Sequence, residues 1–559
     1  MHKQTDKERV EDLKRDFEHL RAERAKREGD WKEVQKFVAP SAYSWENPHD
    51  RNPKRPRRYT SRPTNFLKTL KSGICGYSVS PNIAWLKLGF EDSRHAEGYG
   101  ARDWLEAVEK TMYAEFNRSN LYPQVSKLIE NAACYGHSAM LIDEQLADNR
   151  IRFSAISTPE AYLDTNEYGE VDTVFRRYAM TLKNAAAFFG ESNLNDARRQ
   201  EYTDKRNWNN EFVTLHAVHK RQGYDPDSKA AWDMPYASVY VDEGQDHILL
   251  ESGYGEFPFA VFAWDPVTGT PYGESPAIHA LDDIRMLNII DETRIKIAQL
   301  AAEPPLNVPD SMREGLNVVP AGYNYYTKPD EIIKPIQTGA SYPISLEIHQ
   351  QIEKRVKDWF HVDFFLALMQ ERPANMTATY VMELQGEKAS VLSDLIVNLN
   401  AALSAIVKRS FNILWRQRKL PMPPESLAGS GAELKVDFMG PLAQAQKKYH
   451  ESAGIGQGIA LIGSVAALSP GSLDVVDFDR ALKDGLAGLG FPQAAIREDA
   501  DVEAARAERA ARQARASQQA MAMEQQKSLL GNYRQLNEPV KPGSAVEEMA
   551  KQAAGGLFP

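Results

Sequence analysis

The chain has 559 residues, of which 42% are hydrophobic and 26% are charged, and its formal net charge is −10. This composition is typical of a globular protein with two to four domains, and the acidic balance argues against a repressor-like or histone-like protein, which needs a strongly basic face. No run of eighteen apolar residues occurs, and Cys75 and Cys134 are too few for a zinc site, so we expect neither a membrane-spanning helix nor a structural metal.

Residues 5–38 are predicted to form one or two amphipathic helices. Val10, Leu13, Phe17 and Leu20 recur at helical spacing among charged residues. A second apolar stripe starts at Trp31, and Gly29 between the stripes predicts a break.

Residues 41–64 are predicted to form a loop, and it is the most basic segment of the chain. Its cationic residues are Arg51, Lys54, Arg55, Arg57, Arg58 and Arg62. A solvated loop is the favoured interpretation. The alternative is an anionic partner, either DNA or an acidic patch on a neighbouring subunit.

The segment from residue 65 to 267 changes from helical to strand-like patterns. Residues 65–135 look mainly helical. From Ala139 to Val267, short runs alternate apolar and polar residues between Asn, Gly and Asp, which predicts a β-rich lobe. The runs are Met140–Ile142, Ile151–Phe153, Val171–Tyr178, Phe212–Val218 and Val239–Leu250. One helix is expected near Leu182–Phe189.

The residues from Gly273 to Arg418 predict a helix, an insertion, a second helix, a loop and a long helix. Ser275 can cap the first helix, and Pro276 suits its first turn. The apolar positions of that helix are Ile278, Leu281, Ile284, Leu287, Ile290, Ile297 and Leu300. The second helix follows Pro343, and the third is expected from Thr377 to Leu420.

The insertion at residues 303–343 carries seven prolines, which favours short strands over a helix. Tyr323, Tyr325 and Tyr326 lie at its centre. Near the C-terminus, Asp499–Leu530 is rich in Ala, Arg, Glu and Gln, so we expect a helix with few apolar anchors, which copies of itself in a ring could stabilise. The alternative is a frayed or disordered tail. The residues from Asn532 onward are expected to be flexible.

Catalytic and metal-binding motifs are missing from the sequence. There is no phosphate-binding Gly-x-x-x-x-Gly-Lys loop, so we expect no ATP hydrolysis, no cofactor and no enzyme activity. His216 and His219 should point to opposite faces of a strand, and Asp225 and Asp227 suit a turn. The pairs Asp282-Asp283 and Asp291-Glu292 could do acid–base work, but a solvated or channel-lining face is favoured, because sequence neighbours on a helix do not face one another.

Several short motifs, in their order and spacing, resemble portal proteins, the head-to-tail connectors of short-tailed double-stranded DNA bacteriophages. The motifs are Trp31 and Pro40, Thr60-Ser61, Gly73 with Ser80-Pro81 and Trp85-Leu86, Cys134 to Ala139, Gly273-Glu274-Ser275-Pro276 with Ala280-Leu281, Asp283-Ile284 and Leu287-Asn288, Met376 to Thr379, and Gly440 to Gln446. One departure is Tyr380, where the family often has Glu to complete a capping box with Thr377.

The resemblance implies an α+β portal-like fold with a helical stem, a β-containing wing and clip, and a helical C-terminal crown or barrel. The implied parts are the wing at 1–272, a first stem helix at 273–302, the clip at 303–343, a second stem helix at 344–365, a channel loop at 366–376, a long wing helix at 377–420, wing or crown at 421–497, and a C-terminal helix and flexible tail at 498–559.

The resemblance also implies a function in the virion. Copies of the chain would form a ring, typically a homododecamer, at one capsid vertex after assembly in the host cytoplasm. Double-stranded DNA would be packaged and ejected through the ring, which would contact scaffolding and major capsid proteins, the terminase large subunit and then tail adaptor proteins, but no membrane. Other interpretations are a different ring component such as a tail adaptor, and a soluble carboxylate-dependent hydrolase.

Two groups of residues are predicted to carry this function. The DNA-channel candidates are Gln370, Arg372 and Asn375 in the loop, with Lys354, Arg355 and Lys357 on the second stem helix. The last three also suit an exposed face of mixed charge. The docking candidates in the clip are Tyr323, Tyr325, Tyr326 and Lys328. The three tyrosines could instead form a small core of the insertion itself.

Overall fold

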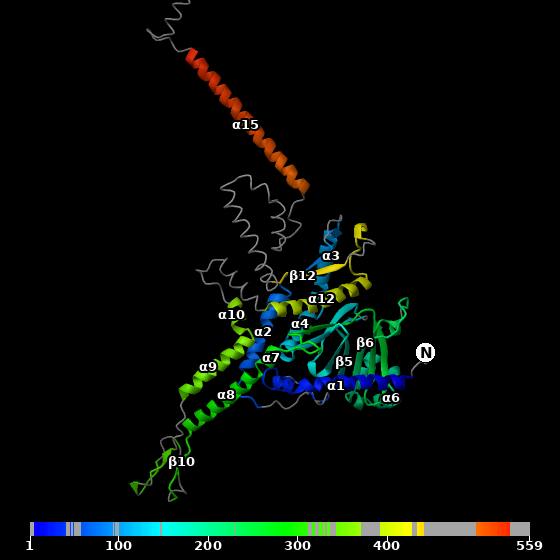
Figure 1. The fold of residues 1–559 in the computed structure, drawn as a ribbon, viewed down its shortest axis with the longest axis vertical. Helices are drawn as coiled ribbons and strands as arrows, with labels where there is room; N and C mark the ends of the chain where they lie inside the picture. The colour runs from blue at the N-terminus through cyan, green and yellow to red at the C-terminus, as the bar shows by residue number, and fades with distance from the viewer. Residues whose placement is uncertain are drawn as a thin grey trace, which may run out of the picture. The chain divides into compact units, whose positions relative to one another are not determined.

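The computed structural model describes residues 5–40, 45, 49, 57–92, 94–95, 100–145, 148–228, 230–310, 316–317, 319, 323–326, 328–329, 332–335, 342–369, 392–427, 433–440 and 499–536. It combines helices and strands in two compact units, Met1–Gln457 and Gly458–Pro559 (Figure 1). Among the described residues, no helix is long and apolar enough to cross a membrane.

The N-terminal helix α1 (Asp6–Phe37) is continuous through Gly29, so the predicted break is wrong. Thr5 and Glu8 form a capping box at its start. Phe17 packs into the core of the β lobe, whereas Trp31 packs into the main core of the first unit. Burial at both ends of one rod stabilises α1 by more than the roughly 1 kcal/mol that a glycine costs inside a helix.

The main core lies among helices and two small sheets. Its helices are α2 (Arg62–Ser78), α3 (Ala101–Arg118), α4 (Leu121–Tyr135) and α12 (Ser393–Arg416). Strand β1 (Leu86–Phe90) pairs antiparallel with β12 (Leu434–Phe438). Strand β2 (His137–Gln145) lies between β3 (Arg150–Ala155) and β9 (Phe259–Ala263). Residues 65–135 are predicted to be mainly helical, and the structure places one strand, β1, between helices α2 and α3.

The β lobe is a five-stranded antiparallel sheet in chain order. Its strands are β4 (Ala161–Thr165), β5 (Val171–Thr181), β6 (Glu211–Lys220), β7 (Tyr236–Asp242) and β8 (His247–Tyr254). Helices α5 (Leu182–Phe189) and α6 (Asp196–Thr203) connect β5 to β6. Leu215 faces the core shared with α1, and Phe212 faces the core shared with α5, as strand alternation requires. The prediction of a β-rich region with a helix at Leu182–Phe189 is confirmed. The prediction of one lobe from Ala139 to Val267 is wrong, because β2, β3 and β9 form a separate sheet in the main core.

The segments predicted as the stem contain four helices among the described residues, and we call these helices the stem. Their boundaries differ from the prediction. The first stem helix is divided into α7 (Pro276–His279) and α8 (Leu281–Ala302) at Ala280. The second is divided into α9 (Tyr342–Trp359) and α10 (Val362–Met369) at His361, whose φ is 48°. Residues 366–369, predicted as loop, are helical because Phe365 anchors α10 in the main core.

The remaining predicted elements are described only in part. Strand β10 (Leu306–Asn307) pairs with β11 (Lys334–Pro335), in agreement with a small-stranded insertion. The long helix predicted at 377–420 is described as α12, which ends at Arg416; residues 377–391 lie outside the described residues. In the second unit, α15 (Asp499–Leu536) is longer than predicted, so residues 532–536 are helical.

Two histidines are buried and should be uncharged in the folded chain. His137 packs against Trp31 and Tyr272, and His216 stacks on Tyr240 with its Nε2 3.0 Å from Ser238 Oγ. Burial lowers the pKa of each imidazole from 6.5 to about 3. Between these values the unfolded chain binds more protons than the folded chain, so the free energy of unfolding falls as the pH falls.

We therefore expect the chain to lose stability on acidification from pH 6.5 towards pH 3. Each histidine should contribute about 1.4 kcal/mol per pH unit below its unfolded pKa. Urea unfolding at a series of pH values tests this, with His216→Gln as the comparison. The variant should show a shallower pH dependence, by close to one proton. An unchanged slope would mean that His216 is protonated in the folded chain.

Candidate functional site

The start of the stem is held by two of the motifs noted in the sequence. Gly136 has a φ of 82°, and a Cβ atom there would overlap the carbonyl oxygen of Gly273. The Ser275 hydroxyl donates to the carbonyl oxygen of Cys134 at 2.9 Å and accepts from the backbone N–H of Ile278 at 3.1 Å. The predicted cap is therefore confirmed. The same serine fixes the stem to the corner between α4 and β2.

Ion pairs join the two long stem helices, which run side by side (Figure 1). Arg355 on α9 binds Asp283 on α8 at 2.7 Å, and His349 Nε2 lies 3.0 Å from Asp291 Oδ1. Glu353 on α9 pairs with Arg62 at the start of α2. The stem is thus connected to the main core through side chains that are distant in sequence.

The three predicted cationic channel residues of α9 therefore differ in their surroundings. Arg355 is paired with Asp283, and Lys357 lies 3.5 Å from Glu353. Lys354 is exposed and makes no ion pair within the described part of the chain. The other channel candidates, Gln370, Arg372 and Asn375, lie outside the described residues. Their roles stay predictions.

The other polar residues weighed in the sequence have structural partners. Asp282 binds Arg285 at 2.6 Å and Glu292 binds Lys296 at 2.7 Å on the surface of α8 itself. Asp283 and Asp291 instead face α9 and are largely shielded from solvent, so the prediction of a solvated or channel-lining face is wrong for these two. Asp225 Oδ1 accepts from the backbone N–H of Asp227 in a turn. Among the described residues, no group of His, Cys, Asp and Glu has the arrangement of a metal site.

Large apolar side chains are exposed along the stem. Eight of the described residues there are between 36% and 60% exposed: Met286, Ile289, Ile295, Leu300, Leu346, Ile348, Trp359 and Leu366. Monomeric proteins rarely leave many such residues on one element, and exposed apolar surface of this kind marks an interaction site. Of the four on α8, the stripe predicted from the sequence included only Leu300, because its other members, such as Ile284 and Leu287, are buried or half-buried.

The clip tyrosines are also exposed. Tyr323, Tyr325 and Tyr326 have exposed fractions of 79%, 88% and 57%, and Lys328 is exposed beside them. The alternative that the tyrosines form a small core of the insertion is therefore wrong for the single subunit. Exposed aromatic side chains offer large contact areas and often anchor interfaces.

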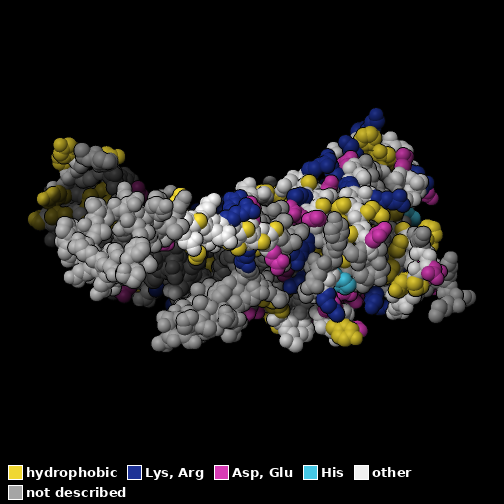
Figure 2. All heavy atoms as spheres, turned by 90° about the horizontal axis from the view of Figure 1, so that it is seen from above, with side chains coloured by type: hydrophobic (Ala, Val, Ile, Leu, Met, Phe, Trp, Pro, Cys, Tyr) yellow, Lys and Arg dark blue, Asp and Glu magenta, His cyan; other side chains and the backbone are white. Residues whose placement is uncertain are grey.

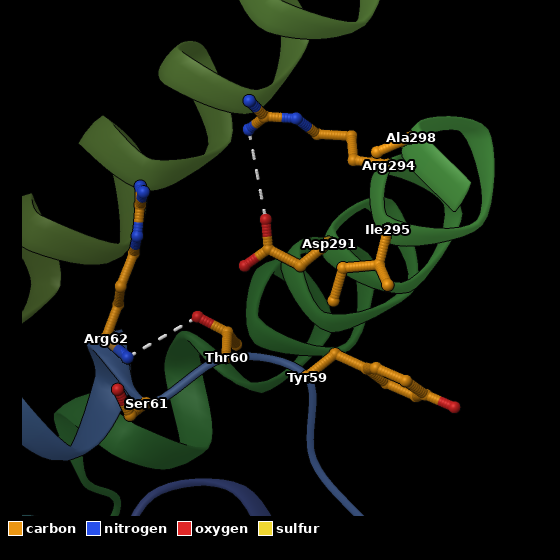
Figure 3. Close-up of a pocket in the computed structure, with 8 residues that line it drawn as sticks. All are labelled: Tyr59, Thr60, Ser61, Arg62, Asp291, Arg294, Ile295 and Ala298. Atoms are coloured by element: carbon orange, nitrogen blue, oxygen red, sulfur yellow. Dashed lines mark hydrogen bonds and ion pairs between the residues drawn. The ribbon is translucent and has the colours of Figure 1, made fainter. Parts of the chain in front are cut away.

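A pocket of about 460 Å³ lies where the segment before α2 meets α8 (Figure 3). Tyr59, Thr60, Ser61 and Arg62 line one side, and Asp291, Arg294, Ile295 and Ala298 line the other. No local sequence pattern indicated this pocket, because its two sides are more than two hundred residues apart. Across the described part of the face in Figure 2, basic and acidic side chains are interspersed.

Comparison with a family model shows the class of protein to which the chain belongs. The chain belongs to the family of bacteriophage head to tail connecting proteins, whose family model matches residues 10–496. The prediction of a head-to-tail connector is thereby confirmed.

Two curated relatives extend over most of the chain. It is 27% identical over 522 residues to the portal protein of Salmonella phage epsilon15, covering 91% of this chain and 92% of that protein. It is 26% identical over 505 residues to a probable portal protein of Bordetella phage BPP-1, covering 88% of this chain and 89% of that protein.

Solved structures give weaker similarities. A chain in the neck of an empty gene transfer agent particle is 11% identical with a TM-score of 0.37, covering 71% of this chain and 86% of that one. A chain in the virion of a native gene transfer agent particle is 11% identical with a TM-score of 0.34, covering 76% and 89%. These scores are too low to establish a shared fold.

Proposed function

We propose that this chain is the subunit of a portal ring at one vertex of a phage capsid, through which double-stranded DNA enters and leaves. Family membership over residues 10–496 supports the role. The main observation in favour of a ring is the apolar surface that the stem exposes in a single subunit. Neighbouring copies would cover this surface, since burying apolar side chains drives association.

The charges of the stem suit a channel that does not hold DNA tightly. Each phosphate contact made by a lysine or arginine adds salt-dependent affinity. Arg355 and Lys357 have acidic partners within the subunit, and the net charge of the chain is −10. Lys354, with Gln370, Arg372 and Asn375 of the predicted channel loop, would then make few and transient contacts with DNA as it slides.

The remaining partners follow from the proposed parts of the ring. The clip, with its exposed tyrosines, would dock the terminase large subunit during packaging and tail adaptor proteins afterwards. The wing would contact scaffolding and major capsid proteins. The stem, in which two helices flank a small-stranded insertion, favours a portal subunit over another ring component of the virion such as a tail adaptor.

We expect the purified chain to assemble into rings. Mass photometry should detect particles of about twelve times the subunit mass of 62.8 kDa, and negative-stain images should show a central channel. Ring formation should persist at high salt, because apolar contacts are not screened. A homogeneous monomer across a wide range of protein and salt concentrations would contradict the proposal, as would ATP hydrolysis that a point substitution in this chain abolishes.

A further inference from the structure

Helix α8 presents two different surfaces on opposite sides. With 3.6 residues per turn, Met286, Ile289, Thr293 and Leu300 share one side, and all four are exposed; we call them the outer row. Four residues of α8 line the pocket in Figure 3 and lie on the other side: Asp291, Arg294, Ile295 and Ala298. One helix therefore carries an apolar row on one side and a pocket on the other.

Several polar groups around the pocket have partners within the subunit. Asp291 pairs with His349 at 3.0 Å, Arg62 pairs with Glu353, and the Thr60 hydroxyl accepts from the backbone N–H of Arg62 at 3.4 Å. The apolar wall is incompletely covered, because Ile295 is 43% exposed. Ile295 and Ala298 thus give the pocket an open apolar wall, against which an aliphatic side chain can pack.

We infer that the outer row of one subunit packs into the pocket of the next subunit around the ring. This inference rests on the proposed ring. A closed ring of more than two copies needs two different surfaces that fit each other, one on each side of the subunit. The outer row and the pocket meet this requirement, because they lie on opposite sides of α8. The occupant of the pocket is thus a second copy of this chain, contributing aliphatic side chains such as Ile289.

The contact also connects ring assembly to the anchoring of the stem. The side of the pocket formed by Tyr59 to Arg62 leads directly into α2, which packs in the main core. A neighbour's side chain in the pocket would therefore touch both the stem and the segment that ties the stem to the core. Residues 59–62 then act in subunit contact, and the basic character of Arg62 serves the ion pair with Glu353.

Cysteine cross-linking between neighbours tests this geometry in the full-length chain. Thr293→Cys places a thiol at the middle of the outer row, and Ala298→Cys places one in the pocket. The double variant, treated with a short thiol cross-linker, should give a ladder of covalent oligomers up to the full ring on a denaturing gel. Each single variant, and the wild type with its own Cys75 and Cys134, should remain mostly monomeric.

A same-side pair, Ile289→Cys with Thr293→Cys, is the matched control and should give no ladder. A ladder from this control would indicate that identical surfaces meet, which overturns the inference. If rings form but the double variant Thr293→Cys with Ala298→Cys gives no ladder, the inference is overturned while the proposed function stands. If the wild type forms no rings, both the inference and the proposed function fail.

A charge in the outer row provides an independent measurement. Ile289 is 60% exposed in the single subunit, so Ile289→Glu should leave the fold intact by circular dichroism. The fraction of protein in rings should fall at least tenfold, because the carboxylate would be buried in the neighbour's pocket. Ile289→Leu, which keeps an aliphatic side chain, should assemble normally. Normal ring assembly by Ile289→Glu would rule out the contact.

Discussion

Gly136→Ala is expected to prevent most of the protein from reaching a stable fold. The residue has a φ of 82°, which is unfavourable by about 1 kcal/mol or more for a residue with a Cβ atom. The new methyl group would also overlap the carbonyl oxygen of Gly273, and relieving such a clash in a packed region typically costs about 1–3 kcal/mol. Together these losses are a large part of the stability of an ordinary domain.

The urea midpoint and the yield of soluble protein measure this effect. Gly269→Ala is the matched control, because Gly269 has the same φ of 82° but no atom within 4 Å of the position its Cβ would take. The control should show only the loss from backbone strain. Equal losses for the two variants would show that α7 can shift away from Gly136, and that the motif does not fix the start of the stem.

Replacing Tyr323, Tyr325 and Tyr326 together with serine is expected to abolish docking at the clip while rings still form. The three side chains are exposed in the subunit, so their removal leaves no cavity. If they anchor an interface, each contributes on the order of 2 kcal/mol to binding. Binding of purified rings to a terminase large subunit or a tail adaptor protein should then fall by at least a hundredfold.

The control for the clip variant lies in the β lobe. Tyr168 is 81% exposed in the turn between β4 and β5, so Tyr168→Ser removes a comparable exposed ring from a different part of the subunit. It should leave docking at the clip unchanged. If the triple variant loses the fold or the ring as well as docking, the tyrosines are structural in the assembled state.

The elements that the sequence by itself determined are those with local, periodic signals. A helix cap needs residues only three positions apart, and Ser275 accordingly caps α7 as predicted. Alternating apolar and polar side chains predict strands β5 and β6, because strand periodicity depends only on neighbours along the chain. The order and spacing of short motifs were also sufficient to identify the family.

Boundaries within helices depended on the tertiary structure. Gly29 predicts a break by its own propensity, but the burial of Phe17 and Trp31 in two different cores keeps α1 continuous. The predicted channel loop likewise begins too early, since Phe365 anchors α10 in the main core. In both places packing energy from distant residues exceeds the local preference, which is of order 1 kcal/mol.

The candidate site also combines features that the sequence predicts with features that only the fold produces. The buried apolar side chains of α8, such as Ile284 and Leu287, follow from a stripe visible in the sequence, but the exposed Ile289 and the pocket do not. Arg62 belongs by sequence to a basic loop, and only the fold brings Glu353 to it from α9. Strands β1 and β12 likewise pair Leu86 with Phe438. Which segments meet is decided by packing summed over the whole subunit, and no pattern within one segment carries that information.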